Sequence, residues 1–186
     1  MSQEIQQIIV NAQNGDLDAF RQLVETHQGF VYNVAFRFLA DEEDARDAVQ
    51  ECFIRLWRNL YKFDARKKLS TWLYKIITNV CYDELRRAYN KYKCKPQDKD
   101  KLMLLLTEAQ NEEDQVSNAD LAVRIKCLSA QLKPRQRAVF VLRDLQDLNM
   151  DEIAQILNIS VSAVKSNLYY ARRNIRKKCI ELGYFS

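Results

Sequence analysis

The chain has 186 residues, a formal net charge of +4 and a hydrophobic fraction of 47%, which suit one medium domain or two small ones. Only three Gly and two Pro interrupt it, a composition that disfavours a turn-rich all-β fold and favours long helices. No apolar run is long enough to cross a bilayer, and the segment MSQEIQQIIV does not have the character of a signal peptide. We therefore expect a cytoplasmic protein without membrane insertion.

The residues that usually support catalysis are scarce. Five cysteines occur singly, with no C-x-x-C pair, which favours idle thiols in a reducing compartment over a metal site or a disulfide framework. There is one histidine, no Gly-rich phosphate loop, and no nucleophile next to a base. We expect no enzymatic activity, no cofactor and no metal. The cysteines are Cys52, Cys81, Cys94, Cys127 and Cys179.

Charge is segregated along the chain. Residues 41–51 and 108–120 are acidic, whereas residues 61–95 and the C-terminal part are basic. Blocks of this kind indicate two cationic surfaces for a polyanion and a separate anionic surface for another partner. Solvated helices can carry similar blocks, so the pattern only supports other observations.

Apolar residues recur at helical spacing through the first half. Residues 17–39 predict a broken pair of amphipathic helices, and residues 45–60 predict another helix with Asp41 as its cap. The segment YKFDARKKLS reads as a basic loop. Ser70 is a good cap for a following helix over residues 71–89.

From about residue 90 the sequence turns polar, and Pro96 would break a helix. The apolar patch Leu102–Leu106 is more than a pure linker needs. Helices resume at about residue 121, and Pro134 marks the start of one of them. We predict an all-α protein with two small helical domains, over residues 17–90 and 121–180, joined by a flexible linker over residues 91–120.

The stretch Met150–Arg176 predicts two short helices joined by a tight turn. Asn158 falls at the turn, where it tolerates a left-handed backbone, and small Ala154 permits close helix crossing. Ser160 or Ser162 can cap the second helix. Its outer face is polar and basic, as the recognition helix of a helix-turn-helix requires. The alternative is a solvated basic helix at the end of a helical domain.

Two strings carry a resemblance to a known family. DEEDARDAVQECFIRLW, followed by the basic loop and STWLYKIITNVCYDELRR, resembles region two of bacterial RNA polymerase sigma factors. LSAQLKPRQRAVFVLRDLQDLNMDEIAQILNISVSAVKSNLYYARRNIRK resembles their region four. The short tether between them is similar to the extracytoplasmic-function (ECF) subfamily. The resemblance implies a sigma factor that binds core RNA polymerase and directs promoter-specific initiation at the minus-ten and minus-thirty-five elements.

The resemblance also assigns roles within region two. An acidic helix face would bind the clamp helices of the polymerase beta-prime subunit; its residues are Asp44, Asp47, Gln50, Glu51 and Arg55. The basic loop and the next helix would open the minus-ten element; their residues are Phe63, Arg66, Lys67, Lys68, Ser70, Lys75, Thr78, Asn79, Tyr82, Arg86 and Arg87. Trp72 matches the family's Trp-Leu pair, and we interpret it as a core residue rather than a stacking platform.

In region four the resemblance implies major-groove reading of the minus-thirty-five element. Lys165, Ser166 and Tyr169 are our candidates for base edges. Arg172, Arg173 and Arg176 are candidates for phosphates. The whole predicted surface is Ser162, Lys165, Ser166, Asn167, Tyr169, Tyr170, Arg172, Arg173 and Arg176. Arg135, Gln136 and Arg137, at a helix start, are further candidates for the DNA backbone.

By the same resemblance we expect contact with the polymerase beta flap, promoter DNA, and an anti-sigma factor that holds the protein inactive. Two other functions stay open from the sequence. One is an activator or repressor that binds its operator alone as a dimer. The other is a helical adaptor that binds only proteins.

Overall fold

A computed structural model describes residues 3–93, 128 and 132–181, and all regular structure within these residues is helical. The predicted all-α class is therefore confirmed. Most of the predicted linker, including the patch Leu102–Leu106, lies outside the described residues. Among the described helices, none combines the length and the apolar character needed to span a membrane.

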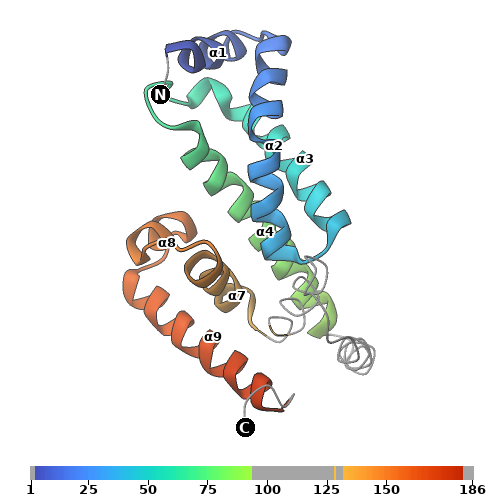
Figure 1. Cartoon of the computed structure of the whole chain (residues 1–186), viewed down its shortest axis with the longest axis vertical. Helices are drawn as coiled ribbons and strands as arrows, with labels where there is room; N and C mark the ends of the chain where they lie inside the picture. The colour runs from blue at the N-terminus through green and yellow to red at the C-terminus, as the bar shows by residue number, and fades with distance from the viewer. Residues whose placement is uncertain (1–2, 94–127, 129–131, 182–186) are drawn as a thin grey trace, which may run out of the picture.

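The first half is a bundle of four helices (Figure 1). They are α1 (Gln3–Gln13), α2 (Leu17–Leu39), α3 (Glu42–Asn59) and α4 (Leu69–Lys93), with a short 3₁₀ turn, η1 (Leu60–Lys62), after α3. Helices α2, α3 and α4 pack against one another, and α1 lies across one end of α2. The core is formed by side chains from all four helices, including Ile9, Phe38, Leu56 and Ile77, each fully buried.

One local prediction, the cap of α3 by Asp41, is confirmed. Asp41 caps α3, its side chain accepting from the backbone N–H groups of Glu43 and Asp44 at 3.0 and 3.1 Å. Asp16 caps α2 in the same way. Carboxylates at these positions satisfy amide groups that have no helical partner.

Two predictions about helix ends are wrong. Residues 17–39 form one continuous helix, because the buried face continues past the exposed Gly29 to Val31 and Val34, and Gly29 itself takes no left-handed conformation. Helix α4 begins at Leu69, so Ser70 lies inside its first turn instead of capping it. Leu69 is buried, and its packing extends the helix beyond the residue that local sequence favours as a cap.

The second half consists of α7 (Pro134–Phe140), a π-helical turn η3 (Val141–Leu145), α8 (Met150–Leu157) and α9 (Val161–Glu181). Pro134 occupies the first turn of α7, as predicted. Helices α8 and α9 form the helix-turn-helix, with Asn158 in the left-handed conformation at φ 52° and ψ 52°. Ser160, and not Ser162, caps α9, accepting from Ala163 N–H at 3.1 Å.

The two halves contact each other mainly through α4, which packs against α7 and α8, and also through α2, which contacts η3 (Figure 1). Arg137 of α7 is only 8% exposed, and its Nη2 donates to the carbonyl of Leu39 at 3.4 Å. Arg37 donates to the carbonyl of Leu145 across the same boundary. Thr78 and Tyr74, on neighbouring turns of α4, have buried hydroxyls without a hydrogen-bond partner.

The contact therefore includes polar groups that are buried and poorly satisfied. Burial lowers the pKa of Arg137 to about 10, so this environment disfavours the guanidinium charge. Its Nε also has no partner. Each unsatisfied buried polar group costs about 1–3 kcal/mol. The free energy that holds the halves together is reduced by these costs.

We predict that Arg137→Met leaves the free energy of unfolding unchanged or raises it by up to about 4 kcal/mol, because methionine keeps an apolar stem and removes a poorly partnered charge. Urea unfolding measures the change. Arg135→Met, at an exposed position of the same helix, is the control and should shift stability by no more than about 0.5 kcal/mol. A loss above about 1 kcal/mol in Arg137→Met alone would contradict this account.

Candidate nucleic-acid interface

A surface pocket of about 860 Å³ lies between η1, the basic loop and the first turns of α4. It brings together five of the residues predicted for the minus-ten element: Phe63, Lys67, Lys68, Lys75 and Asn79. The other lining residues are Arg55, Asn59, Lys62, Asp64, Thr71, Trp72 and Ile76. The pocket therefore has an aromatic and aliphatic wall with lysines around it.

Phe63 and Trp72 form one aromatic wall of this pocket. Their rings stack at 5.0 Å between centroids with an interplanar angle of 14°. Both side chains are half-buried and pack against the core. Trp72 is thus partly a core residue, as interpreted from the sequence, but it also lines the pocket.

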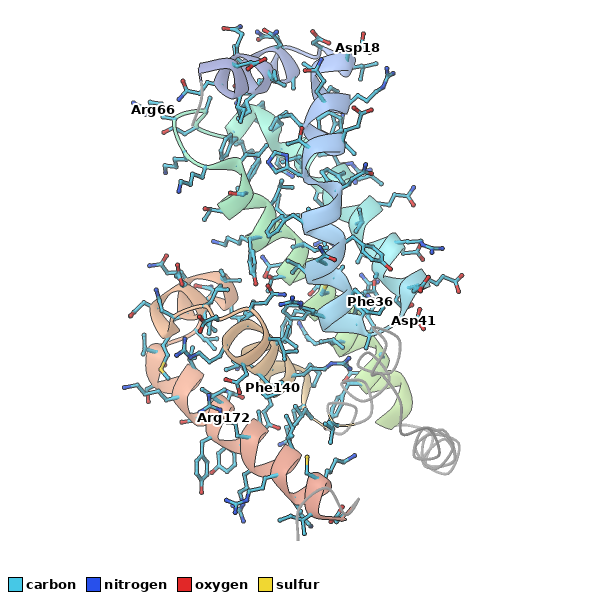
Figure 2. The ribbon with its side chains drawn as sticks, viewed as in Figure 1. Asp18, Phe36, Asp41, Arg66, Phe140 and Arg172 are labelled. Atoms are coloured by element: carbon cyan, nitrogen blue, oxygen red, sulfur yellow. The ribbon has the colours of Figure 1, made fainter. Side chains whose placement is uncertain are left out.

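The loop after η1 is held by a local ion pair. Asp64 accepts from Arg66 Nε at 2.9 Å and Nη2 at 3.0 Å, and from the Arg66 backbone N–H at 3.1 Å. These hydrogen bonds from Arg66 lower the pKa of Asp64 to about 2, so the carboxylate stays charged at neutral pH. Arg66 is exposed at the end of the bundle nearest α1 (Figure 2). Its charge is balanced by the carboxylate of Asp64.

The remaining residues predicted for the minus-ten element do not line the pocket. Ser70 is exposed, Arg86 lies over the Tyr82 ring at 6.0 Å, and Arg87 pairs with Glu84. Thr78 is fully buried, one helical turn from Tyr74, whose hydroxyl interacts electrostatically with Glu152 of α8 where the halves meet. A contact between Thr78 and DNA would need that boundary to open.

The predicted polymerase-binding residues lie on one helix, α3. Asp44, Asp47 and Gln50 are exposed. Arg55 is half-buried and bonded to Glu51 at 2.7 Å, and it also lies 3.7 Å from Asp83 of α4. Three of the five residues thus form an open polar face, and the other two form an ion pair next to α4.

On α9 the predicted DNA-reading face is largely open to solvent. Val164, Leu168 and Ala171 are buried, while Ser162, Lys165 and the other outer residues point away from the core. The exposed set is Ser162, Lys165, Ser166, Tyr169, Tyr170, Arg172, Arg173 and Arg176. Asn167 is half-buried and donates to the carbonyl of Ala163 at 2.7 Å.

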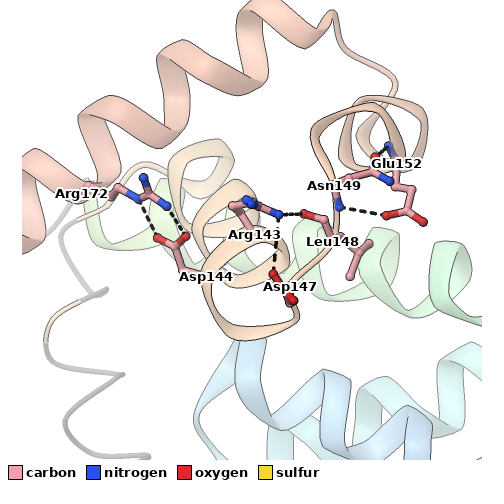
Figure 3. A network of polar contacts seen from close by, with 7 residues as sticks. All are labelled: Arg143, Asp144, Asp147, Leu148, Asn149, Glu152 and Arg172. Carbon is pink, nitrogen blue, oxygen red and sulfur yellow. Dashed lines mark hydrogen bonds and ion pairs between the residues drawn. The ribbon is translucent and has the colours of Figure 1, made fainter.

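Arg172 differs from its neighbours because its guanidinium is paired with a carboxylate of the same chain. It forms two hydrogen bonds with Asp144 of η3, at 3.0 Å from Nε and 2.6 Å from Nη2 (Figure 3). The Asp144 side chain is only 20% exposed, so this bidentate pair is partly shielded from water. The pair links α9 to η3, so Arg172 positions the helix in this structure.

The turn before α8 is fixed by further polar contacts (Figure 3). Asn149 and Glu152 form a reciprocal capping box, each side chain accepting from the other's backbone N–H at 2.9 Å. Arg143 donates to the carbonyl of Leu148 at 2.8 Å. The sequence carries the Asn-x-x-Glu signature of this box, which our sequence analysis did not use.

Comparisons with known proteins agree with this geometry. The family model for sigma-70 region 2 matches residues 23–90, and the model for sigma-70 region 4 matches residues 122–175. The ECF RNA polymerase sigma factor SigW of Bacillus subtilis is 32% identical over 98% of this chain and 100% of its own length. The chain belongs to the ECF sigma factors.

Other relatives cover the protein almost as fully. The RNA polymerase sigma-H factor of Pseudomonas aeruginosa is 27% identical over 92% of both chains. The structure of CnrH, solved in complex with the cytosolic domain of CnrY, shares this fold with a TM-score of 0.62 and 24% identity, over 95% of this chain and 97% of that one. As a sigma factor, the protein directs promoter-specific transcription initiation with RNA polymerase.

Family membership places the two surfaces in context. Helices α2 to α4 lie in region 2, which carries the pocket, and α7 to α9 lie mostly in region 4, which carries the helix-turn-helix. Helix α1 precedes the matched part of region 2 and is not among the helices predicted from the sequence. Its amphipathic spacing, with Ile5, Ile9 and Ala12 on one side, was the available signal.

We predict that Arg173→Gln makes the negative slope of log K against log salt for upstream promoter DNA less steep by about 0.9, because one phosphate contact is lost. Arg172→Gln should leave that slope unchanged, because Asp144 already neutralises this guanidinium. Titrations at several salt concentrations, with polymerase holoenzyme, measure both slopes. If the salt dependence becomes less steep by the same amount in both variants, Arg172 breaks its pair with Asp144 and binds a DNA phosphate.

Proposed function

We propose that the pocket in region 2 captures an unstacked base of the non-template strand during promoter opening. The observation that carries this proposal is the combination of an aromatic wall, Phe63 and Trp72, with lysines at the same pocket. Unstacking a base costs a few kcal/mol, and stacking on an aromatic side chain returns about 1–3 kcal/mol per base. Lysines at the pocket add attraction to the strand's phosphates.

The volume of the pocket supports this proposal. About 860 Å³ lies in the range of pockets that enclose small organic ligands, roughly 300–1,000 Å³. Lys67 and Lys68 are exposed on one side, and Lys75 is exposed on the first turns of α4. A base could enter while its flanking phosphates stay near these ammonium groups.

We further propose that α9 reads the minus-thirty-five element in the major groove. Lys165, Ser166 and Tyr169 are exposed along one face of a helix whose opposite face is packed in the core. Lysine and hydroxyl groups can bond to base edges in the major groove. Arg173 and Arg176, farther along the helix, suit the DNA backbone.

The exposed acidic face of α3 is our candidate for the polymerase beta-prime clamp helices, and region 4 for the beta flap. An anti-sigma partner is also proposed, because the family resemblance implies one. The protein itself would catalyse nothing and act in the cytoplasm. Since Thr78 and Arg137 are buried at the contact between the halves, full engagement of promoter DNA along α4 would separate them.

The deciding experiment mixes the protein with core RNA polymerase and maps transcription start sites. Start sites absent with core alone are expected. An activator or repressor would instead bind its operator without polymerase, and a protein-only adaptor would show no DNA footprint. Footprinting of the holoenzyme should show protection at both promoter elements.

We predict that Lys165→Ala costs about 1–3 kcal/mol of binding to the upstream element and relaxes specificity at one base pair. Affinities for the native element and for single-base variants measure both effects. Lys177→Ala is the matched control, because Lys177 lies on the same helix at 3.7 Å from Glu181 and outside the predicted reading face. Unchanged discrimination in Lys165→Ala would reject its assigned role.

A further inference from the structure

Helix α1 is joined to the base pocket by one side chain. The amide of Gln13 donates to two backbone carbonyls, that of Leu60 at 2.9 Å and that of Phe63 at 2.7 Å. These carbonyls lie at the two ends of η1, the turn from which the pocket loop begins. Gln13 lies 47 and 50 residues away from them in the sequence, so this is a tertiary contact.

The position of Gln13 relative to η1 is fixed by the packing of α1. On the same helix, Ile9 and Ala12 are fully or almost fully buried, which fixes α1 against α2. Gln13 is the last residue of α1 and points its amide at η1. Both donors of one NH₂ group are used, and a planar amide with two fixed partners has little freedom to move.

What Gln13 fixes is one wall of the pocket. Phe63 is the C-cap residue of η1, and its ring stacks on Trp72. A shift of the Phe63 backbone would move this ring and change the aromatic wall. The basic loop that follows, with Asp64 and Lys67, starts from the same point. The only described side chain that donates to both ends of η1 therefore comes from outside region 2 as the family model defines it.

We propose that Gln13 is a positioning residue for capture of the unstacked base: it holds the Phe63 backbone so that the aromatic wall is formed before DNA arrives. This inference rests on the proposed function of the pocket. Preorganising a binding surface lowers the entropic cost of binding, because the loop no longer has to be ordered by its ligand. Gln13 itself does not line the pocket.

The sharpest variant is Gln13→Glu, which keeps the size of the side chain but replaces both donors with an acceptor that faces two carbonyls. The control is Gln7→Glu, because Gln7 is exposed on the same helix and donates only to Asn11 nearby. With holoenzyme on a duplex promoter, we expect Gln13→Glu to reduce open-complex formation about tenfold, a size set by two lost hydrogen bonds. Gln7→Glu should have no effect.

A pre-melted promoter distinguishes positioning from folding. On a template already unpaired over the minus-ten element, Gln13→Glu should initiate within about twofold of the parent protein, because base capture no longer has to drive melting. Loss of activity on both templates, with normal core binding, would overturn the proposal. If Gln13→Glu does not fold, Gln13→Ala removes the donors without adding a charge and serves in its place.

A double-mutant cycle, which combines Gln13→Glu with an abasic nucleotide in the promoter, tests whether the loss of open-complex formation acts through the pocket. A single abasic nucleotide is moved through the non-template strand of the minus-ten element, and open-complex formation is measured with each protein. With the abasic nucleotide at the captured position, open-complex formation by the parent should fall about tenfold. Open-complex formation by Gln13→Glu, already reduced, should fall little further. An insensitive parent would reject the pocket as the capture site; equal sensitivity of both proteins would reject only the role of Gln13.

Discussion

Helix α4 is the element on which the rest of the structure depends, because it is packed on more than one side. One face closes the core of the first half against α2 and α3, and another face contacts α7 and α8. Its first turns also line the region 2 pocket through Trp72 and Lys75. A single helix thus joins the pocket, the bundle core and the boundary between the two DNA-binding halves.

The two packed faces of α4 differ in how well their buried polar groups are satisfied. Toward the bundle, side chains such as Leu73 and Ile77 are fully buried among other apolar groups. Toward the second half, burial includes the hydroxyls of Tyr74 and Thr78 and the guanidinium of Arg137, whose polar atoms lack good partners. Water or DNA could satisfy these groups if the halves separated. The bundle is therefore expected to persist while this boundary opens, because opening returns part of the free energy lost on burial.

Several arginines of this chain are engaged within the fold, whereas the lysines at the pocket are open to solvent. Arg55, Arg66 and Arg172 form ion pairs with carboxylates within the fold, and Arg172 uses the fork of its guanidinium for a bidentate pair. The lysines at the pocket are exposed. A rigid planar fork suits fixed internal geometry, and a flexible ammonium suits a ligand whose phosphates can shift. Formal charge alone therefore overstates how many cations are available to DNA.

The sequence by itself determined the all-helical class, the cap at Asp41, the helix start at Pro134 and the left-handed turn at Asn158, because these follow from side-chain spacing and local hydrogen bonds over a few residues. It also identified the pocket residues Phe63, Lys67 and Lys68 as a group. The tertiary structure alone decided that Gln13 bonds to η1, that Asp144 occupies Arg172, and that Thr78 and Arg137 are buried between the halves. Those contacts join residues from 28 to 98 positions apart. No local pattern specifies such pairs, since they depend on how the helices pack together.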